Sequence, residues 1–411
     1  MKKGIMSNKI RICAIILLTS YSAIGAEMGE FNPVEPNRIP ETLTMISNRI
    51  QSNYDQIKTW QGKEEVIEDY IYEGAKAERL FKTKTDGLGE IPSQIRKHTE
   101  TIIEFSLDAE KGFKYANYYP IKPLQYADLK SLRDLGAKGI AGRRRNIVTP
   151  EYQIDCTGDT MRDGIVMSRR AVKQARPKNN LACAGNLDPV YDPRISFKAF
   201  GNQIWQLFPM LVELIKKRGK YSVDEYDLKV EERKSGDITE YRIILPSKGG
   251  SPESYQYFFS RMVFSSDKGF NIISYQHTVQ NGILLRNRTW NYDFVDGVHV
   301  PKIMTQQDFN WPNGTLRHER IVTFKNQKVN KPISAETFTY KNLGLKNGDK
   351  FIDKILYKEY TYQDEKLIPA SSGSSHMLKK TNPIKNLNRH CKHCRHKWKR
   401  LIILASHWLD S

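Results

Sequence analysis

The chain has 411 residues, of which 39% are hydrophobic and 10% aromatic, and its formal net charge is +19. This apolar content is sufficient for a packed core and excludes wholesale disorder, while the length allows one to three domains. No apolar run approaches 18 residues, which excludes a long transmembrane helix. The location of the positive charge therefore decides whether a nucleic-acid partner is expected.

Residues 1–26 have the composition of a secretory signal peptide. Four basic residues among the first eleven precede an apolar stretch, and small residues follow, so cleavage after Gly25 or Ala26 is expected. Cys13 precedes the apolar stretch, so no lipid-attachment box is visible. A short buried helix is the alternative interpretation. Export would place the mature chain in the periplasm or outside the cell.

The C-terminal residues account for much of the remaining charge. Residues 370–375 resemble a flexible linker, and residues 376–411 carry a net charge of +8. Because 1–26 carry +4, only +7 is left for 27–375, and we expect no nucleic-acid partner. A basic extension of this kind is suited to an anionic membrane surface or wall polymer, and a tail without function is the alternative.

The tail also contains a Cys-x-x-Cys sequence with flanking histidines. Its candidate zinc ligands are His390, Cys391, His393 and Cys394. A redox pair is the other reading of the two cysteines. No second cysteine or histidine pair lies at the usual separation, so we expect no cofactor.

The mature chain begins with a polar leader at 27–40. Apolar residues then follow at helical spacing and predict one amphipathic helix: Leu43, Ile46, Ile50, Tyr54 and Ile57. Residues 101–107 have a strand pattern, and the turn Asp108–Gly112 after them is expected to reverse the chain into a second strand at Phe113. A similar device recurs at 262–273, with the turn Ser265–Gly269.

Residues 120–196 are the least regular part of the chain and form an expected insertion. The three arginines at 143–145 suggest a solvated loop, with an anionic contact as the alternative. Cys156 and Cys183 can form a disulfide in an oxidising compartment, and two separate buried thiols are the alternative.

Residues 197–217 form the most apolar segment. Its large side chains occupy more than one helical face, which predicts a largely buried helix kinked at Pro209. Lys216 to Arg218 followed by Gly219 are typical of a helix end.

Residues 221–365 predict an antiparallel meander. Turn signals occur at Asn281-Gly282, Asp296-Gly297 and Asn313-Gly314 between long β-type segments. Strands of about ten residues suit a sheet that wraps a helix or a ligand. The expected fold is therefore α+β, mostly antiparallel: a strongly curved sheet or half-barrel covered by helices, in one domain at 27–369.

Two short segments of the sequence resemble a known family. Trp290 to Pro301 contains an aromatic step followed by Gly-Val-His-Val-Pro, and Val329 to Phe338 is followed by Gly348-Asp349 and Asp353. With the helix and the meander, these resemble the periplasmic lipoprotein-carrier (LolA-like, lipoprotein-sorting) family. The resemblance covers roughly 40–120 and 197–365. It implies a half-open β-barrel with an apolar cavity that shields acyl chains.

The sequence offers no strong catalytic candidate, and we expect a non-enzymatic protein. His98, His277, His299 and His318 are isolated, and Asp293, Asp296 and Asp308 lie near turns where acids are usually solvated. No phosphate loop, nucleophile elbow or metalloprotease motif is present. The run of acids from Glu64 to Asp69 suggests a solvated edge.

Apolar ligand binding is the leading hypothesis, with lipid acyl chains or lipidated proteins as partners of a monomer. The alternative is an envelope structural or interaction protein in which the same side chains fill the core. The candidate lining residues come from the apolar helix and the β segments: Phe200, Ile204, Trp205, Phe208, Phe259, Trp290, Tyr292 and Phe294.

Overall fold

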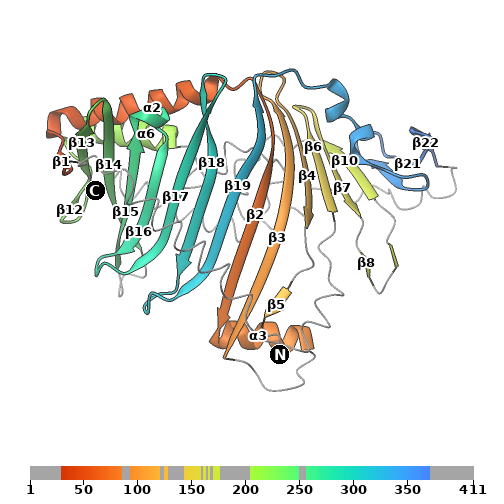
Figure 1. Cartoon of the computed structure of the whole chain (residues 1–411), viewed down its shortest axis with the longest axis horizontal. Helices are drawn as coiled ribbons and strands as arrows, with labels where there is room; N and C mark the ends of the chain where they lie inside the picture. Colours follow the sequence, from red (N-terminus) through yellow and green to blue (C-terminus); the bar gives the residue numbers. More distant parts are fainter. Residues whose placement is uncertain are drawn as a thin grey trace, which may run out of the picture. The chain divides into compact units, whose positions relative to one another are not determined.

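The computed structural model describes residues 29–85, 93–120, 125–127, 143–158, 161–162, 165–166, 170–175, 204–249 and 256–370. It is mostly antiparallel sheet with few helices, as the sequence predicts (Figure 1). The chain divides into two compact units. The first unit comprises Met1–Gln51 and Trp205–Thr289, and the second comprises Ser52–Ile204 and Trp290–Ser411.

The first unit contains an antiparallel meander. Its strands, in order, are β1 (Asn32–Pro33), β13 (Lys229–Ser235), β14 (Ile238–Gly249), β15 (Gln256–Ser265), β16 (Ile272–Val279) and the first part of β17 (Leu284–Val295). A separate short hairpin joins β11 (Ser222–Val223) to β12 (Tyr226–Asp227). The first unit also contains the short helices η1 (Pro36–Arg38) and η2 (Ser266–Lys268). Its longer helices are α2 (Ile39–Asp55), whose last residues belong to the second unit, and α6 (Ile204–Arg218).

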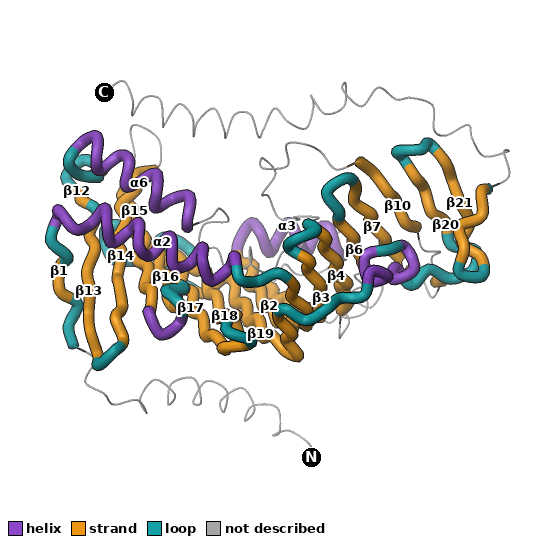
Figure 2. Tube along the Cα trace, turned by 90° about the horizontal axis from the view of Figure 1, so that it is seen from above, coloured by secondary structure: helices purple, strands orange, loops and turns teal. Residues whose placement is uncertain are grey.

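Both longer helices of the first unit bury one face. In α2, Leu43, Ile46 and Ile50 are at most 3% exposed, as helical spacing predicts. In α6, the Phe208 ring lies 5.5 Å from the Phe264 ring of β15. Figure 2 shows α2 and α6 on the same side of these strands. This face of the first unit is therefore packed by helix side chains.

The second unit contains the longest strands. Its antiparallel order is β18 (Val298–Phe309), β19 (Leu316–Val329), β2 (Thr59–Glu73), β3 (Gln94–Asp108), β4 (Phe113–Pro120), β6 (Arg143–Val148), β7 (Tyr152–Gly158) and β10 (Arg170–Ala175). Strand β10 then pairs in parallel with β20 (Lys350–Asp353), which continues through β21 (Lys358–Gln363) to β22 (Lys366–Pro369). Helix α3 (Gly74–Thr85) joins β2 to β3, and the smaller elements are β5 (Gln125–Ala127), β8 (Met161–Arg162), β9 (Ile165–Val166), η3 (Ala335–Phe338) and η4 (Tyr340–Leu343).

Two faces of this second sheet have different surroundings. We call the side of β2 that carries Trp60, Glu64 and Tyr70 the Trp60 face, together with the register partners on β3 and β19. On the opposite face, Tyr115 and Ile154 belong to a core cluster that includes Phe338 and Leu343 from η3 and η4. Tyr115 pairs with Ser106, which pairs with Gln61, so this cluster and Trp60 lie on opposite sides.

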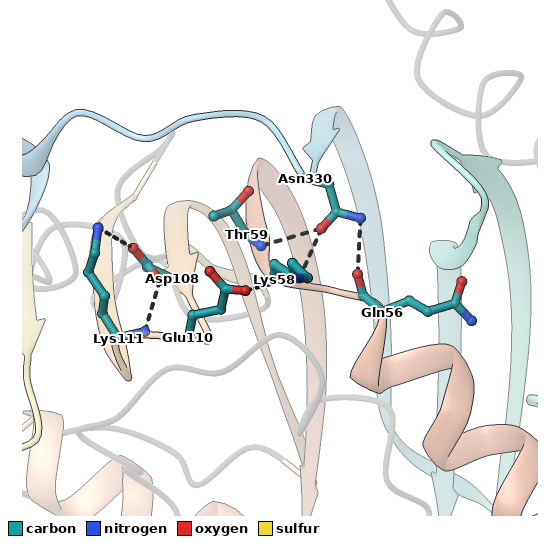
Figure 3. A network of polar contacts seen from close by, with 7 residues as sticks. All are labelled: Gln56, Lys58, Thr59, Asp108, Glu110, Lys111 and Asn330. Atoms are coloured by element: carbon teal, nitrogen blue, oxygen red, sulfur yellow. Dashed lines mark hydrogen bonds and ion pairs between the residues drawn. The ribbon is translucent and has the colours of Figure 1, made fainter.

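One asparagine ties the linker between α2 and β2 to the end of β19 (Figure 3). The side-chain oxygen of Asn330 accepts a hydrogen bond from the backbone N–H of Lys58 at 2.9 Å, and its amide donates to the Gln56 carbonyl at 3.0 Å. Its backbone N–H donates to the Thr59 carbonyl at 2.8 Å. Asn330 has φ 55°, a left-handed conformation that asparagine tolerates. It therefore fixes where β2 begins.

Predictions from local sequence patterns agree with the structure at the hairpin turns, whereas those for residues 143–145 and for helix α6 differ from it. Gly282, Gly297 and Gly314 all have positive φ at the three predicted hairpin turns. The three arginines at 143–145 form part of strand β6, whereas a loop was expected; Arg145 is buried and donates to the Leu343 carbonyl. Helix α6 is buried on one side only, as the 53% exposure of Met210 shows, whereas a largely buried helix was expected. Whether the sheet forms a curved half-barrel stays a prediction.

Candidate functional site

The residues expected to line an apolar concavity do not form one cluster in the structure. Phe208 is fully buried against Phe264, whereas Phe259 lies on the other face of β15 and contacts the Tyr226 ring at 5.1 Å. Trp290 and Tyr292 are buried on β17, and Phe294 is 66% exposed. Phe200 and the side chains of Ile204 and Trp205 lie outside the described residues.

The predicted cysteine and metal sites are mostly outside the described part of the chain. Cys156 is buried in β7, but its expected partner Cys183 is not described, so the disulfide stays a prediction. The candidate ligands His390, Cys391, His393 and Cys394 are also not described. Among the described residues, no group of three or more His, Cys, Asp or Glu side chains could hold a metal ion.

The Trp60 face of the second unit begins with an aromatic cluster, which we call the aromatic zone. Trp60, fully buried on β2, meets Phe105 of β3 edge to face at 5.4 Å and stacks with Phe324 of β19 at 6.2 Å. Gly62 lies between Trp60 and Glu64 on β2, where an added Cβ would come within 2.9 Å of the Phe105 ring. The absence of a side chain at Gly62 therefore lets the Phe105 ring cross over β2.

Further along the same strands the face becomes polar, and we call this part the polar zone. Asp308 of β18 and His318 of β19 are register partners, with Oδ2 of Asp308 3.1 Å from Nδ1 of His318. The Tyr70 ring of β2 stacks on the imidazole at 4.2 Å. Arg320 lies 3.3 Å from Glu68, again across β19 and β2. The expectation that Asp308 is solvated is wrong, because it is 4% exposed.

Glu64 lies between the two zones. It is 1% exposed, and its register partners are Ile103 and Phe324. Burial raises the pKa of its carboxyl group to about 8, although the positive charge of Arg320 opposes this shift. At neutral pH the group is therefore mostly a protonated acid, which can donate a hydrogen bond. The prediction of a solvated acidic edge is wrong for Glu64, because Glu64 and Glu65 point to opposite faces.

Three side chains of this face bury polar atoms that lack a hydrogen-bond partner among the described residues. These atoms are both carboxyl oxygens of Glu64, Nε2 of His318 and Nε of Arg320. Buried polar atoms are nearly always satisfied in proteins, and leaving one unsatisfied costs about 1–3 kcal/mol. Nε of Arg320 and Nε2 of His318 both lie near Oε1 of Glu68, at 3.3 Å and 4.0 Å, whereas the carboxyl group of Glu64 has no hydrogen-bond partner among the described residues. Arg320 has further N–H donors, and the Glu68 carboxylate can accept. The polar zone can therefore bind a group that both donates and accepts hydrogen bonds.

Sequence reasoning missed this arrangement because its members come from distant segments. The aromatic zone joins residues 60, 105 and 324, and the polar zone joins β2 to β18 and β19. One signal was available in β2 itself, since Trp60, Gly62, Glu64 and Val66 alternate with polar residues. That alternation predicts a buried acid at Glu64.

No protein-family model matches the sequence, and no curated protein matches it significantly. Among solved structures, a DUF1329 family protein from Desulfovibrio piger is 10% identical with a TM-score of 0.30, over 76% of this chain and 99% of its own. A putative outer membrane lipoprotein-sorting protein domain from Vibrio parahaemolyticus is 9% identical with a TM-score of 0.30, over 72% and 97%.

No helix among the described residues is both long enough and apolar enough to cross a membrane.

Proposed function

We propose that this protein is an exported, non-enzymatic binding protein that holds an amphiphile on the Trp60 face of its second unit. The ligand class is a lipid, or the lipid group of a lipidated protein. The observation that carries the proposal is the position of Glu64, a buried acid with no hydrogen-bond partner among the described residues, between an aromatic zone and a polar zone. The signal peptide expected at 1–26 supports export.

The two zones match the two parts of an amphiphile. Trp60, Phe105 and Phe324 are at most 4% exposed, so an acyl chain would reach these rings only by displacing what covers them. Burial of the chain there would contribute about 0.8 kcal/mol per methylene. Glu64 and the N–H groups of Arg320 that do not face Glu68 can donate to carbonyl, ester or phosphate oxygens of the head group, and the Glu68 carboxylate can accept from an amide or hydroxyl group. The family resemblance in the sequence favours the same ligand class.

Mass spectrometry tests the ligand class directly. Protein purified from its own host is analysed under native conditions, and organic solvent then extracts any bound lipid. We expect a mass above that of the polypeptide and a recoverable acyl-bearing compound. A clean polypeptide mass with no extractable lipid would count against the proposal.

Fluorescence titration with dansylated undecanoic acid tests the location. We expect Arg320→Gln to weaken binding by about tenfold, equivalent to about 1.4 kcal/mol, because it removes a donor from the polar zone. Arg317→Gln is the matched control, since Arg317 is exposed and lies only three residues away, at the β-bulge of β19. Equal affinities for the two variants would place the ligand elsewhere. Thermal unfolding of both variants checks that they fold.

A further inference from the structure

A separate cavity lies on the opposite face of the second unit and is independent of the proposed amphiphile site. It has a volume of about 370 Å³, within the range of small-molecule sites. Strands β7, β10, β20, β21 and β22 form its floor, and the junction of η3 and η4 forms one wall. The right-hand side of Figure 1 shows these strands together.

Four aromatic rings line this cavity. Phe351 is buried in the lining, with the ring of Tyr340 at 6.3 Å and that of Tyr360 at 6.2 Å. Tyr152 of β7 supplies the fourth ring. All three tyrosines are partly exposed, so their rings remain accessible from the cavity. The lining therefore offers flat apolar surfaces to a ligand.

One ion pair lies among these rings and is balanced in charge. The ammonium of Lys173 is 3.2 Å from Oδ2 of Asp353 and 4.6 Å from the centre of the Tyr152 ring. Asp353 is 3% exposed, and its Oδ1 accepts from the backbone N–H groups of Ile355 and Leu356. Both oxygens of the carboxylate thus have partners, and Lys173 retains further N–H donors.

The phenolic hydroxyls have a different status. Those of Tyr152, Tyr340 and Tyr360 form no hydrogen bond with any other described residue. Each can both donate and accept a hydrogen bond. The cavity therefore combines apolar ring faces with several hydrogen-bonding groups at their edges.

These features select among ligand classes. A purely apolar ligand would cover the hydroxyls and Lys173 without satisfying them. An anion would face the buried Asp353, and a cation would compete with Lys173 for the same carboxylate and ring. A neutral ring that carries hydroxyl groups meets all conditions, because its C–H face stacks on the aromatic rings while its hydroxyls bond to tyrosines and Lys173. We propose that this cavity binds a neutral saccharide.

Saturation-transfer NMR with maltose, cellobiose and N,N′-diacetylchitobiose tests this proposal on the full chain. We expect at least one disaccharide to bind with a Kd of about 1 mM or tighter. Tyr340→Ala and Tyr360→Ala should each weaken that binding by about tenfold. Tyr357→Ala is the matched control: it removes a tyrosine that is 61% exposed in the adjacent turn, outside the cavity lining, and should change nothing.

Several results would overturn the proposal. The first is that none of the three disaccharides binds to the wild type, and the second is that the cavity variants and the control bind equally. The third is that tetramethylammonium or a proline-rich peptide binds more tightly than the disaccharides. Should an alanine variant fail to fold, Tyr340→Phe and Tyr360→Phe keep the rings and remove only the hydroxyls, and we expect each to weaken binding by about threefold. Dansylated undecanoic acid should bind the Tyr340 variants as it binds the wild type.

Discussion

The imidazole of His318 is held between two register neighbours, Asp308 on one side and Tyr70 on the other. Its Nδ1 is 3.1 Å from Oδ2 of Asp308, and its ring stacks on Tyr70 at 4.2 Å. Because both neighbours are fixed by strand pairing, the orientation of Nε2 toward the Trp60 face follows from sheet register. The sheet therefore positions the polar zone without help from a loop.

Removing Asp308 should destabilise the fold. Asp308→Ala leaves Nδ1 of His318 and the amide of Gln306 without this acceptor, and we expect the free energy of unfolding to fall by about 2–4 kcal/mol. Asp293→Ala is the matched control, because Asp293 forms only an exposed ion pair with Lys302 and should cost less than about 1 kcal/mol. Urea denaturation measures both, and equal losses would contradict the structural role of Asp308.

Glu64 should make stability depend on pH in an unusual direction. Its folded pKa of about 8 exceeds the ordinary value of 4.5, so the folded state holds a proton that the unfolded state has lost between these values. Relative to Glu64→Gln, the wild type should lose about 1.4 kcal/mol of unfolding free energy for each pH unit between 4.5 and 8. Above pH 8 the difference should become constant.

The control for this experiment is the neighbouring acid. Glu65 points to the opposite face of β2 and pairs with Lys325 at 2.6 Å. Glu65→Gln removes an acid from this opposite face and is measured beside Glu64→Gln. Denaturant titrations from pH 5 to pH 9 provide the measurement, and a slope shared by the wild type and Glu64→Gln would show that Glu64 does not carry a raised pKa.

Gly62 should tolerate no side chain while Phe105 is present. A Cβ at this position would lie 2.9 Å from the Phe105 ring, and overpacking of this kind typically costs about 1–3 kcal/mol. We expect Gly62→Ala to destabilise the protein and to weaken binding of dansylated undecanoic acid. In the background of Phe105→Leu the same change should cost less, because the smaller side chain leaves room. A double-mutant cycle measures this coupling, and strictly additive effects would argue against it.

Much of the fold could be predicted because its signals are local. The Asx-Gly turns gave hairpins where Gly282, Gly297 and Gly314 reverse the chain, and helical spacing placed the buried face of α2 correctly. The parallel pairing of β10 with β20 could not be predicted, because it joins segments about 180 residues apart in the sequence. In addition, β10 lies inside the irregular stretch and β20 lies beyond it. The same reason hid the cluster of Trp60, Phe105 and Phe324, whose members meet only after three strands have paired.

Asn330 should contribute more to stability than its exposure suggests. Asn330→Ala removes the bonds to Lys58 and Gln56 and places alanine at positive φ, for an expected loss of about 2–4 kcal/mol. Asn326→Ala is the matched control, since Asn326 has φ 52° but no such bridging role, and should lose only the conformational part of about 1–2 kcal/mol. Thermal unfolding compares the two, and similar losses would mean that the bridge in Figure 3 contributes nothing.

His98 should titrate above the ordinary histidine range. Burial lowers the pKa of this imidazole, but the hydrogen bonds to Asp69 at 2.7 Å and Glu100 at 3.1 Å outweigh burial and raise it above 6.5. The stabilisation from this raised pKa is therefore complete below pH 6.5 and is lost as the pH rises through the folded pKa. NMR titration of the imidazole C–H signals measures the value. Asp69→Asn should lower it, whereas Asp55→Asn, on α2, should leave it unchanged. A His98 pKa at or below 6.5 in the wild type would contradict the carboxylate contacts seen in the structure.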